Sequence, residues 1–190
     1  MATIDLAPPD GLSADERCRR IESEELPPTM AQLLFDAAAG REDQLLWNFF
    51  DEGVTATYGQ ALEQVTRAAR AFAAWGVGKG THVGIMLPNV PQLPVAWLAL
   101  ATLGAVMVPI NVRYSARELR YVVEDGEVER LLIDASLVGL LGEGEGPGLM
   151  PAGTVRTVGE RLVGYDSWDA AVAEAEARLP ALQPVERDDL

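Results

Sequence analysis

Residues 87–112 form the longest stretch of the chain without a charged side chain. Its length would allow a single helix to cross a lipid bilayer. Two prolines near its start, a glycine and a further proline divide it into a helix-length segment, 91–103, and a short β-rich segment, 105–110. Proline is tolerated in the first turn of a helix, and glycine commonly ends one. We therefore expect a buried helix followed by a buried strand, and no membrane span.

The residues on either side extend this pair into an alternating series. Strands are predicted at 82–87, 105–110 and 130–134, with helices at 91–103 and 115–125 between them. Connections of this length join parallel strands, and the helices must then cover both faces of the sheet. The predicted fold class is therefore α/β, built from parallel βαβαβ layers with helices on both faces.

Weaker signals surround this series. Residues 1–28 are acidic and contain prolines, and we predict an extended lead without a secretory signal. The glycine-rich residues 139–148 are predicted to form a flexible surface loop. The other expected elements are a helix at 29–39, a hairpin with strands at 45–50 and 54–58, helices at 59–75 and 167–179, and a strand at 154–158.

Charge and composition exclude several classes of function. The formal net charge is −14, with −8 in residues 1–56, zero in 57–141 and −6 in 142–190. An acidic surface repels a polyanion, so no nucleic-acid partner is expected. One cysteine, Cys18, and one histidine, His82, exclude a disulfide framework and any cysteine-based or multi-histidine metal site. The composition favours a soluble protein of a reducing compartment, and we predict a cytoplasmic location.

The sequence contains few motifs that indicate catalysis. Residues 76–81 (GVGKGT) resemble a phosphate loop, but a glycine follows the lysine where Ser or Thr is required, and a strand follows rather than a helix. A helix-to-strand turn fits better. Cys18 and His82 have no partner that would make either a nucleophile, a base or a ligand. No residue is assigned a catalytic, cofactor-binding or metal-binding role.

Four residues that directly follow predicted strands indicate a ligand site. Ligands of open parallel sheets bind beyond the carboxyl ends of the strands. Pro88 and Asn89 follow the first predicted strand, and Asn111 and Arg113 follow the second. These residues are predicted to border a crevice for substrate or coenzyme A, where Arg113 could meet an anion. The alternative is that Asn111 and Arg113 only hold their loop in place.

Taken in order, several segments resemble the adenylate-forming superfamily of acyl-CoA synthetases, peptide-synthetase adenylation domains and luciferases. Residues 57–62 (TYGQAL) are similar to the first core motif of that family, and residues 103–111 (LGAVMVPIN) to the second. Between them, residues 76–80 (GVGKG) and 83–89 (VGIMLPN) look like another family stretch, and residues 111–113 (NVR) match its Asn-x-Arg. In these motifs Thr57, Tyr58, Gly104 and Pro109 are expected to have structural roles.

The resemblance is best over residues 29–135. It implies that residues 29–190 are the first, incomplete portion of the large N-terminal domain of an AMP-binding ligase. The sequence of residues 97–121 most resembles the carnitine- and crotonobetaine-CoA ligase-like or medium-chain branch of the family. A complete member would use ATP, Mg²⁺ and coenzyme A to convert a carboxylic acid first to an acyl-AMP and then to an acyl-CoA thioester.

The sequence departs from the family at one decisive point. The Ser/Thr/Gly-rich phosphate loop is absent from the 190 residues, as are the ribose-binding aspartate and the catalytic lysine of the C-terminal domain. We therefore expect an N-terminal portion that is inactive alone, binds no cofactor tightly and associates with itself through an exposed sheet edge. The alternative is a non-catalytic binding or regulatory module that uses the same α/β half.

Overall fold

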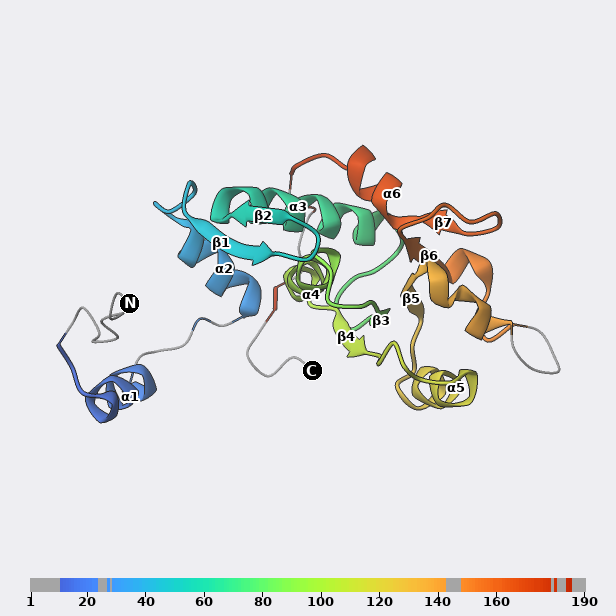
Figure 1. Cartoon of the computed structure of the whole chain (residues 1–190), viewed down its shortest axis with the longest axis horizontal. Helices are drawn as coiled ribbons and strands as arrows, with labels where there is room; N and C mark the ends of the chain where they lie inside the picture. The colour runs from blue at the N-terminus through green and yellow to red at the C-terminus, as the bar shows by residue number, and fades with distance from the viewer. Residues whose placement is uncertain are drawn as a thin grey trace.

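The computed structural model describes residues 11–23, 27, 29–142, 148–178, 180, 184 and 185. Its centre is a five-stranded parallel sheet with the strand order β4-β3-β5-β6-β7 (Figure 1). The strands are β3 (His82–Met86), β4 (Val106–Pro109), β5 (Arg130–Asp134), β6 (Val155–Val158) and β7 (Asp166–Ser167). The predicted α/β class, with parallel strands and helices between them, is confirmed.

Helices cover both faces of the sheet, which is why the central strands β3 and β5 bury apolar side chains on both faces. One face packs against α2 (Met30–Ala38), α3 (Tyr58–Ala74), α4 (Gln92–Leu103) and α6 (Trp168–Glu174). The other packs against α5 (Ala116–Asp125) and the 3-10 helix η1 (Ala135–Leu141). In β5, Leu132 belongs to the first core, and Leu131 and Ile133 belong to the second. All three are completely buried, and burial of each such side chain stabilises the fold by about 1.5–3 kcal/mol.

The uncharged stretch of residues 87–112 divides into a helix and a strand, as predicted. It forms α4 and β4, and Gly104 between them has a φ of 67°, a left-handed conformation that glycine adopts without strain. α4 buries residues around most of its circumference, so it needs no lipid to cover it. None of the helices in the described residues has the length and apolar character needed to span a membrane.

Reciprocal capping boxes fix the starts of α3 and α5. At α5, the spacing of Ser115 and Glu118 predicts this contact, and the backbone N–H and hydroxyl of Ser115 donate to Glu118 Oε2 at 2.8 and 2.7 Å. These two bonds hold the pKa of Glu118 below its ordinary value. The ionised carboxylate therefore supports the cap above pH ~4.3, the ordinary glutamate pKa, and this support is lost as the pH falls through the lowered folded pKa.

The elements around the sheet largely follow the predictions. Thr29 caps α2, and β1 (Leu45–Phe49) and β2 (Val54–Thr57) form the expected antiparallel hairpin, apart from the main sheet. β6 lies within the predicted strand. α6 begins after Ser167 as expected but ends at Glu174 rather than near residue 179. The two-residue strand β7, at the edge of the sheet, was not predicted.

Two predictions about irregular segments are wrong where the structure describes them. Part of the expected extended lead forms α1 (Ala14–Ser23), because Ser13 and Glu16 make reciprocal capping bonds and acidic residues occupy its first turn. The expected loop at 139–148 is helical through Leu141, because apolar side chains of η1 pack on the second core. Residues 1–10, 24–26, 28, 143–147, 179, 181–183 and 186–190 lie outside the described residues.

Candidate functional site

The four residues of the predicted crevice lie at one edge of the sheet. β3 and β4 are parallel neighbours in which Ile85 pairs with Pro109, and Ile110 N donates to Ile85 O at 2.9 Å. The carboxyl ends of the two strands therefore lie side by side. Pro88 and Asn89 follow the first of them, and Asn111 and Arg113 follow the second, so both segments border the same end of the sheet.

The strand order indicates where a crevice opens along this edge. From β3 the chain crosses to β4 on one side, whereas from β5 it crosses to β6 on the other. The crossovers thus diverge between β3 and β5, and ligands of open α/β sheets bind at such a point. Asp134, which ends β5, lies on the far side of it from Asn89. Its Oδ1 accepts from the backbone N of Ser136 at 2.9 Å, which fixes the first turn of η1.

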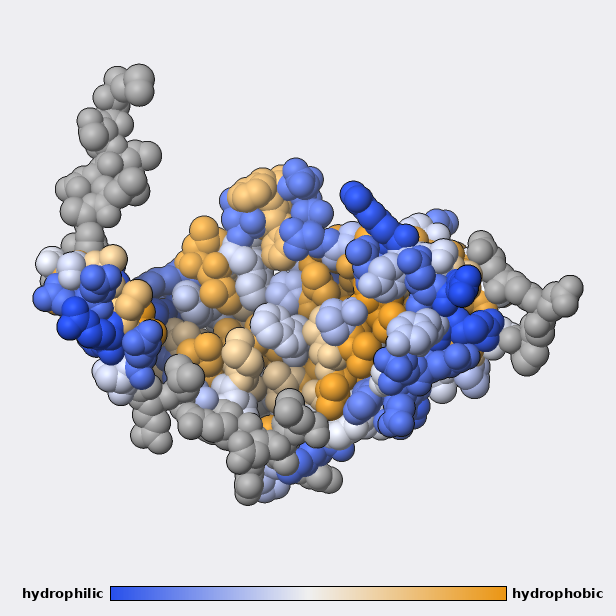
Figure 2. All heavy atoms as spheres, turned by 90° about the horizontal axis from the view of Figure 1, so that it is seen from below, coloured by the Kyte–Doolittle hydropathy of each residue, from blue (hydrophilic) through white to orange (hydrophobic). Residues whose placement is uncertain are grey.

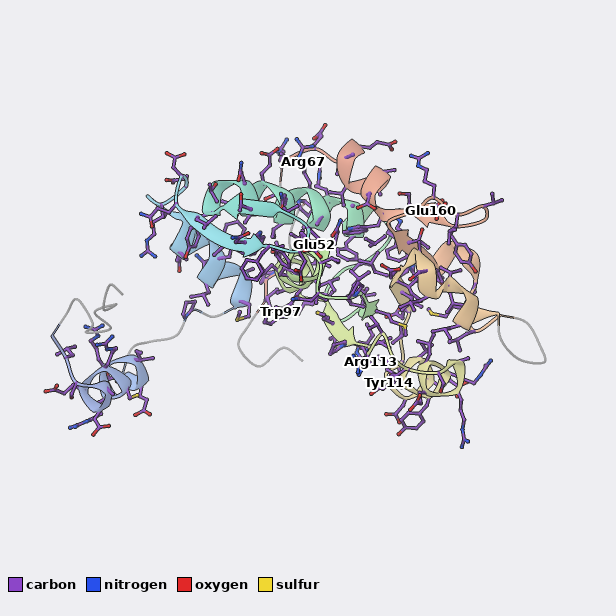
Figure 3. All side chains as sticks on the ribbon, viewed as in Figure 1. Glu52, Arg67, Trp97, Arg113, Tyr114 and Glu160 are labelled. Carbon is purple, nitrogen blue, oxygen red and sulfur yellow. The ribbon has the colours of Figure 1, made fainter. Side chains whose placement is uncertain are left out.

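The loop after β4 shows what Asn111 does. Its Oδ1 accepts from the backbone N of Arg113 at 2.9 Å, and its carbonyl accepts from Tyr114 N at 3.0 Å. Asn111 therefore helps to hold the loop in place, and a crevice role for Asn111 and Arg113 stays a prediction. Arg113 is exposed, and no side-chain bond or ion pair links its guanidinium to another described residue. Figure 3 shows Arg113 and Tyr114 together where the chain passes from β4 to α5.

An open cavity of about 660 Å³ adjoins this loop on α5. Two aromatic rings, Tyr114 and Tyr121, line it together with the guanidinium of Arg117. Tyr121 is 64% exposed, so its ring is available to a ligand. Phenol rings stack on planar groups, and guanidinium groups bind phosphates or carboxylates in a bidentate manner. The carboxylate of Glu118 also lines the cavity, which therefore presents one positive and one negative group beside two aromatic rings.

A second feature of the carboxyl edge was missed by the sequence analysis. The Asp169 carboxylate accepts from Gly159 N at 3.0 Å and from Gln92 Nε2 at 3.4 Å. Because Gln92 begins α4 and Gly159 follows β6, Asp169 connects the loops after β3 and β6. Its position beside the Ser167 cap gives no sequence signal for a contact with residues so distant along the chain.

The core-motif residues have other places in the fold. Thr57 caps α3, which begins at Tyr58; Gly104 ends α4 at the amino end of the sheet; and Pro109 ends β4. His82 also lies at the amino end, where its Nδ1 is 2.7 Å from the carbonyl oxygen of Gly126. The described residues contain no group of three His, Cys, Asp or Glu side chains that could hold a metal ion.

Residues 34–189 match the family of AMP-binding enzymes, so the chain belongs to that family. Among curated relatives, crotonobetaine/carnitine–CoA ligase of Proteus mirabilis (strain HI4320) is 36% identical over 91 residues, 48% of this chain and 15% of its own length. The 3-hydroxybenzoate–CoA ligase of Aromatoleum sp. (strain CIB) is 32% identical over 130 residues, 66% of this chain and 24% of its own length. The chain thus spans a quarter or less of these relatives.

Solved structures show the same fold. The inhibitor-bound N-terminal domain of FACL13 from Mycobacterium tuberculosis aligns with a TM-score of 0.73 at 25% identity, over 86% of this chain and 39% of that one. The anthranilate CoA ligase AuaEII, in complex with anthranoyl-AMP, aligns with a TM-score of 0.72 at 19% identity, over 86% and 31%. The predicted resemblance to adenylate-forming ligases, and to the N-terminal domain of their fold, is confirmed.

Proposed function

We propose that this chain is the N-terminal portion of an ATP-dependent acyl-CoA synthetase. In the reaction, a carboxylate and ATP give an acyl-AMP and pyrophosphate, and coenzyme A then displaces AMP to form a thioester. The family match over residues 34–189 carries this proposal. It is supported by relatives named as CoA ligases for crotonobetaine or carnitine and for 3-hydroxybenzoate. We therefore propose that the acyl group comes from a small carboxylic acid.

The carboxyl edge of the sheet is the part of the chain suited to substrate or coenzyme A. We assign Pro88, Asn89, Asn111 and Arg113 to the border of that crevice. In the cavity, Arg117 offers a guanidinium group to the phosphates of coenzyme A, and Tyr114 and Tyr121 offer rings to its adenine. The exposed Arg113, in the adjoining loop, offers a second guanidinium group. Asn111 contributes by fixing the backbone of Arg113.

We propose that this chain alone does not bind ATP tightly. The 190 residues contain no Ser/Thr/Gly-rich loop to surround a triphosphate, and the only lysine, Lys79, lies at the opposite end of the sheet. We therefore propose that the isolated chain does not activate a carboxylate and binds coenzyme A weakly. The single cysteine is consistent with a cytoplasmic enzyme that works without disulfides.

Two measurements test this function together. The first is the DNA sequence beyond the codon for Leu190, which is expected to encode the missing phosphate loop in the same frame. The second is thioester formation from ATP, coenzyme A and a panel of carboxylates that includes 3-hydroxybenzoate and crotonobetaine. We expect the longer product to form acyl-CoA and the isolated chain to show no ATP–pyrophosphate exchange above the blank. Exchange by the purified chain, or a reading frame without the loop, would contradict the proposal.

We also propose that two copies of the isolated chain associate. Hydrophobic side chains gather on the face shown in Figure 2. Met30 and Leu33 of α2 and Trp97 of α4 are between 42% and 46% exposed. β4 is an edge strand of the sheet, and exposed edges and apolar patches favour association. Sedimentation velocity is expected to show a concentration-dependent dimer that the exchange of Trp97 for Glu weakens. A monomer at all concentrations would contradict this.

A further inference from the structure

A second open cavity lies at the edge of the sheet that β7 forms. It measures about 440 Å³ and lies between β6, β7, the loop that joins them and α6. β7 stands at the opposite end of the strand order from β4, which leads into the loop of Arg113. In Figure 3, Glu160 marks the loop between β6 and β7, well away from Arg113 and Tyr114. This cavity is therefore separate from the candidate crevice.

Four charged side chains line this cavity, two of each sign. Arg156 of β6 and Arg161 of the loop carry the positive charges. Asp166 of β7 and Glu174 of α6 carry the negative charges. No ion pair joins any of the four to another side chain in the part of the chain that the structure describes. The opposite charges thus stay apart around one cavity, and each can still pair with a ligand.

Neutral groups hold the Arg156 guanidinium in place. Its Nη1 donates to the carbonyl oxygen of Ala71 at 3.1 Å, and its Cζ lies 4.7 Å from the centre of the Trp75 ring. Its Nε is buried and has no hydrogen-bond partner. Burial lowers the pKa of Arg156, and the negative charge of Asp166 opposes this shift only in part. Because arginine stays protonated in proteins, the fold keeps a partly buried positive charge here without an ion-pair partner, and an anionic group would stabilise it.

The remaining lining decides which ligand the cavity favours. A simple anion would meet the like charges of Asp166 and Glu174, and a simple cation would meet those of the two arginines. A zwitterion satisfies both pairs, because guanidinium groups bind its carboxylate in a bidentate manner while the carboxylates accept from its ammonium group. Leu162, Ala170 and Ala171 add an apolar wall to the cavity. The lining therefore matches a small molecule with both charges and an apolar group.

We propose that this cavity is a binding site for a free amino acid with an apolar side chain. Its carboxylate lies against Arg156 and Arg161. Its ammonium group faces Asp166 and Glu174, and its side chain packs on Leu162. The site does not depend on the function proposed above, because it shares no residue with the crevice.

Titration of the full 190-residue chain with L-leucine, followed by NMR of the backbone amides, tests the site. The amides of Ser167 and Ala170 report on it, because both residues line the cavity and Ala170 N donates to Ser167 Oγ at 3.3 Å. Saturable shifts of these amides are expected, with a dissociation constant on the order of 1 mM. If leucine caused no saturable shift, the proposal would be wrong.

Two analogues of leucine test whether both charges of the ligand are needed. Isocaproate has the same carbon chain and carboxylate without the ammonium group, and isoamylamine has the ammonium group without the carboxylate. Each is expected to bind about tenfold more weakly than leucine, because each loses one charge-assisted contact. Isocaproate that bound as tightly as leucine would show a site for simple anions and would overturn the proposal.

Arg161 and Glu174 are exposed, so replacing either one tests the charges without opening the core. Arg161→Gln is expected to weaken leucine binding about tenfold. The matched control is Arg120→Gln on α5, where Arg120 pairs with Glu124 at 3.9 Å, and it is expected to leave leucine binding unchanged. Glu174→Gln is expected to weaken leucine but to strengthen isocaproate, because it removes a like charge that faces the anion. Equal leucine affinity in the two arginine variants, or a Glu174→Gln variant that weakens both ligands alike, would also overturn the proposal.

Discussion

Replacing Trp168 with alanine is expected to lower the free energy of unfolding by about 3–5 kcal/mol. Trp168 begins α6 and is 2% exposed, and its ring centroid lies 4.3 Å from that of Phe72 on α3. Removing the indole leaves a cavity between α6, α3 and the sheet that these rigid elements fill only in part. Since domains of this kind are stable by about 5–15 kcal/mol, the loss is a large fraction of the total.

Urea unfolding followed by far-ultraviolet circular dichroism measures this loss. Trp97→Ala is the matched control, because Trp97 is 46% exposed on α4 and its removal opens no internal cavity. The control is expected to change the unfolding free energy by less than about 1 kcal/mol. If both variants unfolded at the same urea concentration, the packing of α6 would not stabilise the first core, which would contradict the prediction.

Gly84→Val is expected to destabilise the protein by at least about 2–3 kcal/mol, through crowding rather than through a cavity. Gly84 lies in β3, which is paired on both sides by β4 and β5. A Cβ atom there would lie 3.0 Å from Ile110 Cδ1 and Leu131 Cδ1, and 3.1 Å from Val128 Cγ1. Valine adds two further methyl groups where three neighbours already leave no room.

The same unfolding measurement separates crowding from a general intolerance of side chains. Gly78→Ala is the control, because a Cβ atom at that position meets no atom within 4 Å. Combining Gly84→Val with Leu131→Ala is expected to cost less than the sum of the two single changes, because the shorter side chain makes space. Strictly additive costs would show that the destabilisation at position 84 has another origin.

Much of the fold could be predicted because local and tertiary preferences agree. Residues 91–103 have both the length of a helix and the apolar character of a buried one, and Gly104 marks its end. The Ser115 and Glu118 spacing fixes the start of α5 within one residue. Ser13 and Glu16 have the same spacing and form the same reciprocal bonds at the start of α1. The prolines nearby favour an extended segment, and the capping bonds outweigh this preference.

What could not be predicted depends on contacts between distant residues. β7 is two residues long and has no periodicity of its own, so only its pairing with β6 defines it. The strand order, which makes the crossovers diverge between β3 and β5, follows from how the crossovers pack and not from any local pattern. Asp169 and Gln92 meet for the same reason. The position of Pro88, Asn89, Asn111 and Arg113 beyond the strand ends could be predicted because it is a property of every open parallel sheet, and their role in a crevice stays a prediction.

The place of β3 in the middle of the sheet also affects how the chain must form during its synthesis. Val83 pairs with Met107 of β4 and with Arg130 of β5, 47 residues later along the chain. At about 5–20 residues per second, a ribosome takes several seconds to complete that second partner. For this interval, the side of β3 that pairs with β5 has no hydrogen-bonding partner.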